Sequence, residues 1–392
     1  MSDRADALPR PLKGVAALQA AMNGAHFAAM PMLAILVTQR VEGGAAVAGT
    51  ALAIYFALSR IGPVFLAPAV DRLGPWHGVS VGLCLRGLAF MVLPLAAQGV
   101  GALAAAALLG LGQAVYEVSL YGVIGRQARA QRDRLLVLND QALNLGCVLG
   151  PLSGAALAWW SAEAAFFVAG AALVALGLGC TAVRSDLLRA PAMDHAEGIV
   201  MPMLRDRRFV VLCVSLLPFW AVFAQLFAAF PLLAARLGDA PAWANSILVI
   251  NGLAGIVALA CLGPWVARDR TLRILGIGLL LAFASIAGTA MVGELWVLLA
   301  FVAVFSVGES FVMLAGQILT ARHAEGRSAT AYFGAFKASA GVGAGLGAYV
   351  GVITAGDEGG TGFITLGAIG ILSLAGLAFY VCSRPNQGRA SN

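Results

Sequence analysis

The sequence contains few charged residues and long apolar runs in place of the polar surface that a soluble domain needs. Only 11% of its 392 residues are Asp, Glu, Lys or Arg, 60% are hydrophobic, and the mean hydropathy is +0.89. These values lie far outside the range of soluble globular domains. They exclude a soluble enzyme and indicate an integral membrane protein embedded in a lipid bilayer.

Motifs for enzymatic chemistry are also absent. The chain has no GxxxxGK[ST] segment for nucleotide phosphates and no HExxH segment for zinc. The six cysteines stand singly in apolar runs, so they predict neither a disulfide framework nor a zinc site. We expect no enzymatic activity, no cofactor and no bound metal. A membrane sensor would need an output domain, and no polar stretch is long enough to form one.

Twelve apolar runs are each close to the ~20 residues that cross a bilayer. We expect spans at 14–38, 46–70, 78–97, 100–125, 135–159, 163–183, 209–234, 242–266, 272–291, 295–321, 328–354 and 361–382. The connections between them are short, which favours antiparallel neighbours.

Lys and Arg are concentrated in alternate loops, and the opposite set of loops carries only Arg40 and Arg236. Positive loops stay on the cytoplasmic side of a membrane. We therefore expect both termini in the cytoplasm. Topology then accounts for the net charge of +6 without a nucleic-acid partner.

The longest polar connection, residues 184–208, follows the sixth span and divides the spans six and six. A charged loop followed by a glycine-rich span occurs once in each half, which is typical of transporters built from repeats. We expect an N-terminal six-helix bundle (1–183), a cytoplasmic linker (184–208) and a C-terminal six-helix bundle (209–392). The two bundles would surround a central cavity in a monomer.

Two motifs carry a family resemblance. GCVLGPLSG in span five fits a GxxxGPxxG pattern with Gly146, Gly150, Pro151 and Gly154, and VDRLG between spans two and three contributes Asp71, Arg72 and Gly74. With these motifs the chain resembles the major facilitator superfamily, in particular its twelve-helix drug:proton antiporters. The resemblance implies two bundles that rock about a central cavity and export a substrate against protons across the bacterial inner membrane.

The three glycines of span five recur every four residues, so they share one smooth helix face that a neighbour can approach closely. Pro151 lacks an N–H group and is expected to bend the helix. The resemblance implies that this face lies between the two halves and helps to seal them against leakage. Packing without a gating role is the alternative.

Six charged side chains lie inside the spans, where each costs several kcal/mol unless it is paired or hydrated. They are Arg60, Arg86, Glu117, Asp140, Glu309 and Lys337. One interpretation is a salt-bridge network that holds spans two to five together. The other is that a carboxylate carries the coupling proton, with Glu117 as first candidate, Glu309 as second and Asp140 closer to the headgroups.

Aromatic and amide side chains on the presumed cavity helices suit an amphipathic organic solute. They are Asn23, His26, Phe27, Tyr116, Phe219, Trp220, Phe223 and Gln225. Met22, His26 and Met30 also share a helix face and leave open a copper transporter, although a methionine and histidine face is more often core.

The function that we expect is proton-coupled export of small amphipathic organic molecules. The substrate is either a range of drugs or one dedicated metabolite such as a siderophore. An importer of the same fold is the alternative.

Overall fold

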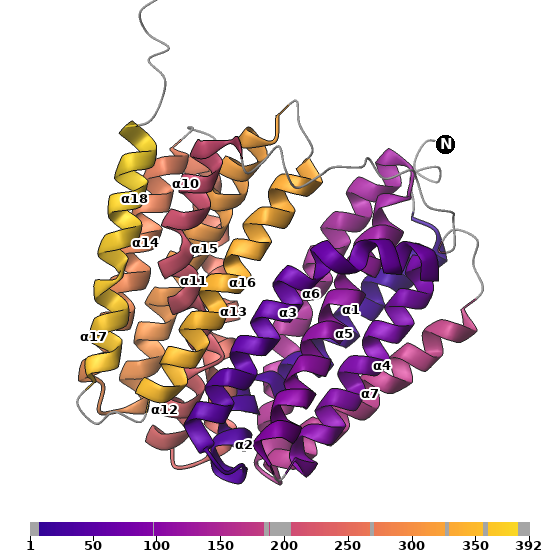
Figure 1. The fold of residues 1–392 in the computed structure, drawn as a ribbon, viewed down its shortest axis with the longest axis horizontal. Helices are drawn as coiled ribbons and strands as arrows, with labels where there is room; N and C mark the ends of the chain where they lie inside the picture. The colour runs from indigo at the N-terminus through magenta and orange to yellow at the C-terminus, as the bar shows by residue number, and fades with distance from the viewer. Residues whose placement is uncertain are drawn as a thin grey trace, which may run out of the picture.

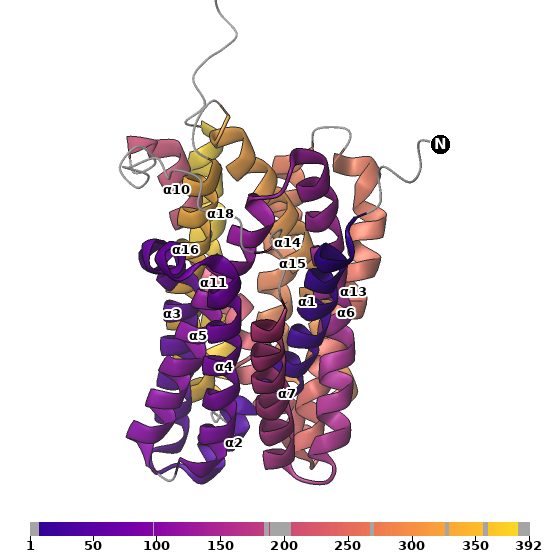
Figure 2. The ribbon, with the colours of Figure 1, turned by 90° about the vertical axis from the view of Figure 1, so that its right-hand side faces the viewer.

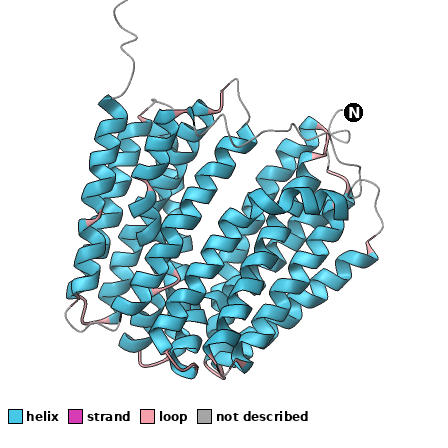
Figure 3. Ribbon diagram, in the orientation of Figure 1, coloured by secondary structure: helices cyan, strands magenta, loops and turns pink. Residues whose placement is uncertain are grey.

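The computed structural model describes residues 8–96, 98–183, 188, 205–266, 270–325, 329–355 and 360–382. Every regular element in these ranges is a helix (Figure 3). Within them, twelve helical segments are long and apolar enough to cross a bilayer. The prediction of an all-α protein with twelve spans is confirmed.

The first six spans occupy the N-terminal half of the chain. They are formed by α1 (Arg10–Ala29) with η1 (Met30–Met32) and α2 (Leu33–Arg40), α3 (Gly44–Leu73), α4 (Pro75–Val92) with η2 (Leu93–Leu95), α5 (Gly99–Gly125), α6 (Arg129–Ala158) and α7 (Ala162–Ala182).

The last six spans occupy the C-terminal half. They are formed by α10 (Arg207–Ser215), α11 (Leu217–Phe223), η3 (Ala224–Leu226) and α12 (Ala229–Leu237), then η4 (Pro241–Trp243) with α13 (Ala244–Val266), α14 (Thr271–Gly288) with η5 (Thr289–Met291), α15 (Leu295–His323), α16 (Ala329–Thr354), and α17 (Thr361–Ala368) with α18 (Gly370–Cys382).

Most predicted bounds agree with the observed helices to within a few residues. The largest difference at a helix start is in span five, because α6 begins at Arg129 and includes charged residues that we placed in the preceding loop. Spans one and seven are each interrupted by a short 3-10 segment, η1 and η3. Hydropathy predicts the length of a span but not such interruptions.

The turn between spans two and three depends on one glycine. Gly74 has a φ of +87°, a backbone conformation that disfavours residues with a Cβ atom. It ends α3, and Pro75 begins α4 at the first helical position, where a missing N–H group costs nothing. This is the reason that the VDRLG segment reverses the chain within two residues.

The helices form two groups that stand side by side in Figure 1, and in the view of Figure 2 the N-terminal group lies in front of the C-terminal group. One buried apolar cluster is centred on α1 to α7, and a second on α10 to α18. The start of α1 and the end of α18 lie at the same end of the molecule (Figure 1). Most of the predicted linker, 184–208, lies outside the described residues.

The two groups touch mainly through α3 against α16 and α6 against α13. Glycines permit the first contact: a Cβ atom added at Gly49 would lie 3.0 Å from Cα of Tyr349, and one added at Gly345 would lie 3.2 Å from the carbonyl oxygen of Ala53. Helices α3 and α16 lie close near α2 and α12 and diverge toward the end that carries the termini (Figure 1).

Candidate functional site

An ion pair joins the two halves inside the membrane-spanning region. The Nζ atom of Lys337 on α16 contacts Oε1 of Glu117 on α5. Lys337 is 38% exposed and Glu117 16% exposed, so the pair is partly sheltered from solvent. The ammonium group also lies 4.9 Å from the ring centroid of Tyr121, within the range of a cation–π contact. Two of the six intramembrane charges are thus partners, although they come from different halves.

Arg60 on α3 adds a second positive charge near this pair. A Cβ atom added at Gly341, one turn after Lys337 on α16, would lie 2.6 Å from Cβ of Arg60. Both Lys337 and Arg60 act electrostatically on Glu117. The carboxylate of Glu117 therefore faces cations from both halves of the molecule.

Glu309, the second proton candidate, lies within the C-terminal half. Its Oε2 atom accepts a hydrogen bond of 2.5 Å from Nδ2 of Asn251 on α13. The same amide group lies 3.0 Å from Oγ of Ser306, one turn before Glu309 on α15. Glu309 is therefore hydrogen-bonded by a neutral amide of its own half.

The interpretation of a network that holds spans two to five together is not supported by the described side chains. Arg86 on α4 is fully buried, and its Nη1 atom lies 2.7 Å from the sulfur of Met22. Its guanidinium carbon lies 5.5 Å from the ring centroid of Tyr116. The described carboxylate on spans two to five, Glu117, pairs with span eleven instead. The side chain of Asp140 lies outside the described residues.

The polar residues predicted on span one form a buried hydrogen-bonded cluster. Nδ2 of Asn23 donates to the carbonyl oxygen of Gln19 at 3.0 Å. The hydroxyl of Tyr116 donates to Oε1 of Gln19 at 2.6 Å. Nε2 of His26 lies 3.2 Å from the hydroxyl of Tyr55. Gln19 and Tyr55 were not among our candidates, although an amide inside an apolar span is a visible signal.

These contacts count against the copper alternative. Met22 is beside the permanent positive charge of Arg86, which repels a metal cation. One ring nitrogen of His26 is already engaged by Tyr55. Among the described residues, no three His, Cys, Asp or Glu side chains are grouped as a metal site.

A band of aromatic rings crosses from one half to the other. Phe227 lies 6.5 Å from Phe27 of α1 and 5.8 Å from Phe56 of α3, between ring centroids. Phe223 of α11 lies 6.0 Å from Phe227 and 5.7 Å from Trp220. The pair of Phe27 and Phe227 is stacked and the other three pairs are edge-to-face, and both arrangements are favoured between aromatic rings. Phe27 and Phe223, both predicted to line the cavity, are half-buried in this band.

Three other predicted cavity residues lie deeper in the protein. Phe219 and Gln225 are fully buried, and Trp220 is 4% exposed. Nε2 of Gln225 donates to the carbonyl oxygen of Gly347 on α16 at 2.8 Å. Gln225 thus fixes the interrupted span seven against span eleven, within the C-terminal half.

The glycine face of span five packs differently from our expectation. A Cβ atom at Gly150 would lie 2.6 Å from the carbonyl oxygen of Gly24, and Gly146 and Gly154 likewise face α1. The face therefore lies against span one of the same half, and not between the halves. A different face of α6 meets the other half, since Gly252 of α13 lies near Val148.

The residues of the VDRLG motif lie where α3 ends and α4 begins. Arg72 is exposed, Gly74 forms the turn, and the side chain of Asp71 lies outside the described residues. Pro151 is inside the continuous helix α6.

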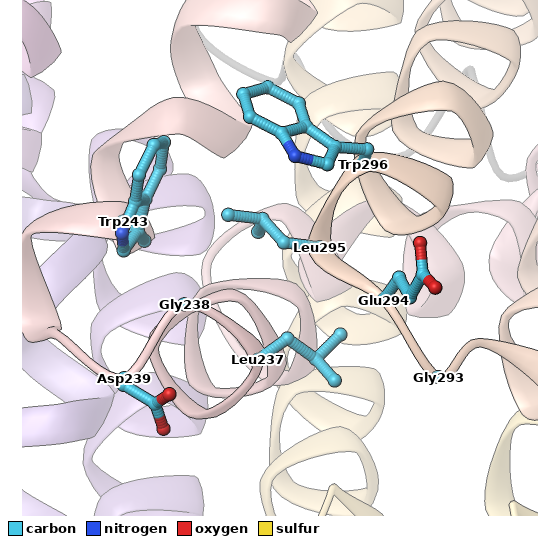
Figure 4. A pocket seen from close by; sticks show the side chains of 8 residues that line it. All are labelled: Leu237, Gly238, Asp239, Trp243, Gly293, Glu294, Leu295 and Trp296. Atoms are coloured by element: carbon cyan, nitrogen blue, oxygen red, sulfur yellow. The ribbon is translucent and has the colours of Figure 1, made fainter.

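A surface pocket of about 400 Å³ lies in the C-terminal half, at the end of the molecule opposite the end of α18 (Figure 4). The rings of Trp243 and Trp296 stand at 78° with centroids 6.0 Å apart, and Leu237 and Leu295 line the floor. Tryptophans gather at membrane–water interfaces. The pocket involves none of the intramembrane charges, so it is distinct from the site described above.

Comparison with known proteins agrees with this arrangement. The sequence profile of the Major Facilitator Superfamily matches residues 15–294. The chain belongs to this superfamily. It is a multi-pass membrane transporter protein, as the motifs in spans two to five suggested.

Relatives of this transporter include "Multidrug resistance protein MdtH" of Yersinia pestis (strain Pestoides F). The two sequences are 27% identical over 367 residues, which cover 90% of this chain and 89% of the relative. MdtH of Yersinia pseudotuberculosis serotype O:1b (strain IP 31758) matches equally.

Solved structures show the same fold at low sequence identity. A POT family transporter in complex with 5-aminolevulinic acid has a TM-score of 0.79 at 15% identity. The match covers 95% of this chain and 96% of the POT family transporter. The nucleoside transporter NupG has a TM-score of 0.74 at 11% identity, and the match covers 94% of this chain and 98% of NupG. These likenesses establish the major facilitator fold.

Proposed function

We propose that this transporter exports small amphipathic organic molecules across the bacterial inner membrane in exchange for protons. The likeness to MdtH over most of both chains and the GxxxGPxxG pattern support export. The bias of Lys and Arg supports cytoplasmic termini. We further propose that 1–183 and 209–392 are the two moving bundles of a monomer, joined by 184–208.

The observation that carries the proposal is the pair between Glu117 and Lys337. Ionised groups are costly in the membrane unless they are paired or hydrated. When Glu117 takes up a proton, Lys337 loses its partner, and the contact between α5 and α16 weakens. A proton that binds one arrangement of the halves better than the other shifts the balance between them. Glu117 is thereby our first candidate for the coupling residue, ahead of Glu309.

The character of the substrate is inferred from the aromatic band. Apolar walls with a few polar groups are the usual chemistry of organic ligand sites. Phe27, Phe56 and Phe223 supply such walls beside the charges of both halves. We propose an organic substrate, which is either one of several drugs or a dedicated metabolite such as a siderophore.

An importer of the same fold is the second candidate, and proteoliposomes distinguish the two. Antiport drives a substrate toward the acidic side of a membrane, and symport drives it toward the alkaline side, whatever the orientation of the protein. A panel of fluorescent amphipathic molecules with positive, zero and negative charge is followed under an imposed pH gradient, with the membrane potential clamped. We expect accumulation on the acidic side, above that in protein-free liposomes. Accumulation of every transported member on the alkaline side would identify an importer.

A further inference from the structure

Arg86 is a buried charge whose hydrogen-bonding capacity is mostly unused. The side chain is fully buried, and one of its three guanidinium nitrogens, Nη1, contacts the weak acceptor sulfur of Met22. The Nε and Nη2 atoms have no acceptor among the residues that the structure describes. A guanidinium stays protonated in proteins, and a buried cation that lacks a partner is strongly destabilising. Arg86 therefore needs an anionic or strongly polar partner.

The two free nitrogens define the shape of that partner. The N–H groups of Nε and Nη2 point in parallel from one edge of the planar guanidinium. Two oxygens of a carboxylate fit this edge in a bidentate contact, which is among the strongest hydrogen-bonded pairs in proteins. The sulfur of Met22 contacts Nη1, so the edge formed by Nε and Nη2, which suits a carboxylate, has no such contact.

His26 provides a third unused polar atom in the same cluster. It lies one helical turn after Met22 on α1, and its Nδ1 atom is buried with no partner in the described part of the chain. Its Nε2 atom lies 3.2 Å from the hydroxyl of Tyr55, and that hydroxyl can donate to it. In this tautomer the Nδ1 atom carries the proton and is free to donate to an anion.

The surrounding charges are mostly positive. Arg60 and Arg86 both act electrostatically on His26 and Tyr55. Glu117 is the nearby described carboxylate, and Lys337 already binds it. Among the described side chains, neither arginine has a carboxylate within ion-pair distance. The potential in this part of the N-terminal half therefore favours an anion.

We propose that the free edge of Arg86, with Nδ1 of His26, binds the carboxylate of the transported molecule. The inference rests on the function proposed above and narrows its substrate class to organic acids. Phe90, with its ring 5.6 Å from that of His26, and Phe27, at 5.1 Å, provide apolar surface for the rest of the molecule. Met22 lies against the guanidinium, so the ligand enters when this side chain of α1 moves aside.

The site is separate from the pair of Glu117 and Lys337. Substrate and proton consequently do not compete for one side chain, and their coupling passes through the movement of the halves. The carboxylate bound at Arg86 belongs either to the transported substrate or to a small anion from the solution. The experiment below includes a measurement that separates these two sources.

The test uses three probes with one ring system and different head groups: 1-naphthoate, 1-naphthalenemethanol and 1-naphthylmethylammonium. Binding to the purified full-length protein is measured by the ligand-dependent rise of its unfolding midpoint. We expect 1-naphthoate to bind with a Kd about tenfold or more below that of the alcohol. Equal binding of the three probes, or tightest binding of the amine, would overturn the inference, and this arm needs no variant.

Arg86→Lys is the matched variant, because it keeps the charge and removes the bidentate edge. We expect about a tenfold loss of 1-naphthoate affinity, with the affinity for the alcohol unchanged. Equal losses for both probes would contradict a carboxylate site. Arg60→Gln serves as the control for a general effect of positive charge, and we expect it to lower the affinity for 1-naphthoate less than Arg86→Lys does.

The two sources of the carboxylate are separated by competition and transport. If acetate displaces 1-naphthoate, and 1-naphthoate does not inhibit transport of any molecule from the fluorescent panel, the site holds a solution anion and the substrate assignment fails. Inhibition by 1-naphthoate that is lost in Arg86→Lys supports it. The absence of gradient-driven accumulation for the whole panel would instead contradict the proposed function.

Discussion

Glu117 and Lys337 are 220 residues apart in the chain, yet their side chains are in contact. The sequence indicates that both charges lie inside spans, because each interrupts an apolar run. It does not indicate that they are partners, since the pairing depends on how α5 and α16 from different halves are aligned. For the same reason the sequence left open a salt-bridge network around Arg86, and the separation of Arg86 from the described carboxylates is visible only in the fold.

The contact between these two residues can be measured by a double-mutant cycle. Glu117→Lys places two ammonium groups together, and Lys337→Glu places two carboxylates together, so each single variant should be less stable than the wild type. The double variant restores opposite charges. We expect an interaction free energy on the order of 1–3 kcal/mol from the unfolding midpoints of the four proteins. Additive effects of the single changes would show that the pair does not contribute to stability.

Glu309 differs from Glu117 in that its polar partner is an amide of its own half. The variant Glu309→Gln keeps a side-chain oxygen that can accept the hydrogen bond from Asn251 and removes the carboxyl group that ionises. We expect transport driven by a pH gradient to stay close to that of the wild type, because in this account the proton that shifts the balance between the halves binds Glu117. Loss of gradient-driven transport in Glu309→Gln, with normal membrane insertion, would move the coupling role to this residue.

At the scale of single elements, helix α6 shows what periodicity does and does not predict. Glycines four residues apart correctly indicate a smooth helix face, because their positions on the helix follow from its geometry. The neighbour that uses the face was predicted wrongly, since α1 of the same half lies there instead of the other half. Spacing within one helix contains no information about which helix packs against it.

The close approach of α1 and α6 gives a prediction for Gly150. A Cβ atom there would lie 2.6 Å from the carbonyl oxygen of Gly24, so Gly150→Ala forces the two helices apart. We expect a loss of about 1–3 kcal/mol in unfolding free energy. The control is Gly24→Ala on the facing helix, where a Cβ atom meets nothing within 4 Å. A decrease in the unfolding midpoint for the control as large as that for Gly150→Ala would contradict this account.

The spans themselves were predicted well, because length and hydropathy determine whether a segment can cross a bilayer. The interruptions at η1 and η3 were not predicted. Pro31 lies in η1 and was a visible signal, whereas η3 contains no proline. Pro218 is the second residue of α11 and follows the earlier break at Leu216 in the same span. A proline indicates a weak point in a helix but not the geometry that its neighbours impose.

At the scale of the whole molecule, the contact between α3 and α16 is the main link between the halves. Cysteines at Ala53 and Gly345 test whether it opens during transport. The carbonyl oxygen of Ala53 lies 3.2 Å from the position of a Cβ atom at Gly345, so the two residues are close enough for a disulfide.

We expect oxidation of Ala53→Cys/Gly345→Cys, in a background without native cysteines, to stop transport, and reduction to restore it. Each single cysteine variant is the control and should be insensitive to oxidant. Undiminished transport by the fully cross-linked protein would show that this contact stays closed throughout the cycle.

Composition, charge bias and motifs together predicted the class, the number of spans and the superfamily. The way in which the halves lean together could not be predicted, because it depends on contacts between helices that are distant in sequence. Figure 1 shows these contacts concentrated away from the termini. A transporter that alternates between two arrangements must break such contacts and form others.

The most direct test of proton coupling compares wild type with Glu117→Gln in proteoliposomes that contain a pH-sensitive dye. The interior is made acidic, the membrane potential is clamped, and a transported member of the fluorescent panel is added outside. The account predicts that the wild type accumulates the substrate while the interior becomes more alkaline, and that Glu117→Gln shows neither change despite normal folding. Substrate accumulation with proton efflux at wild-type rates in Glu117→Gln would contradict it.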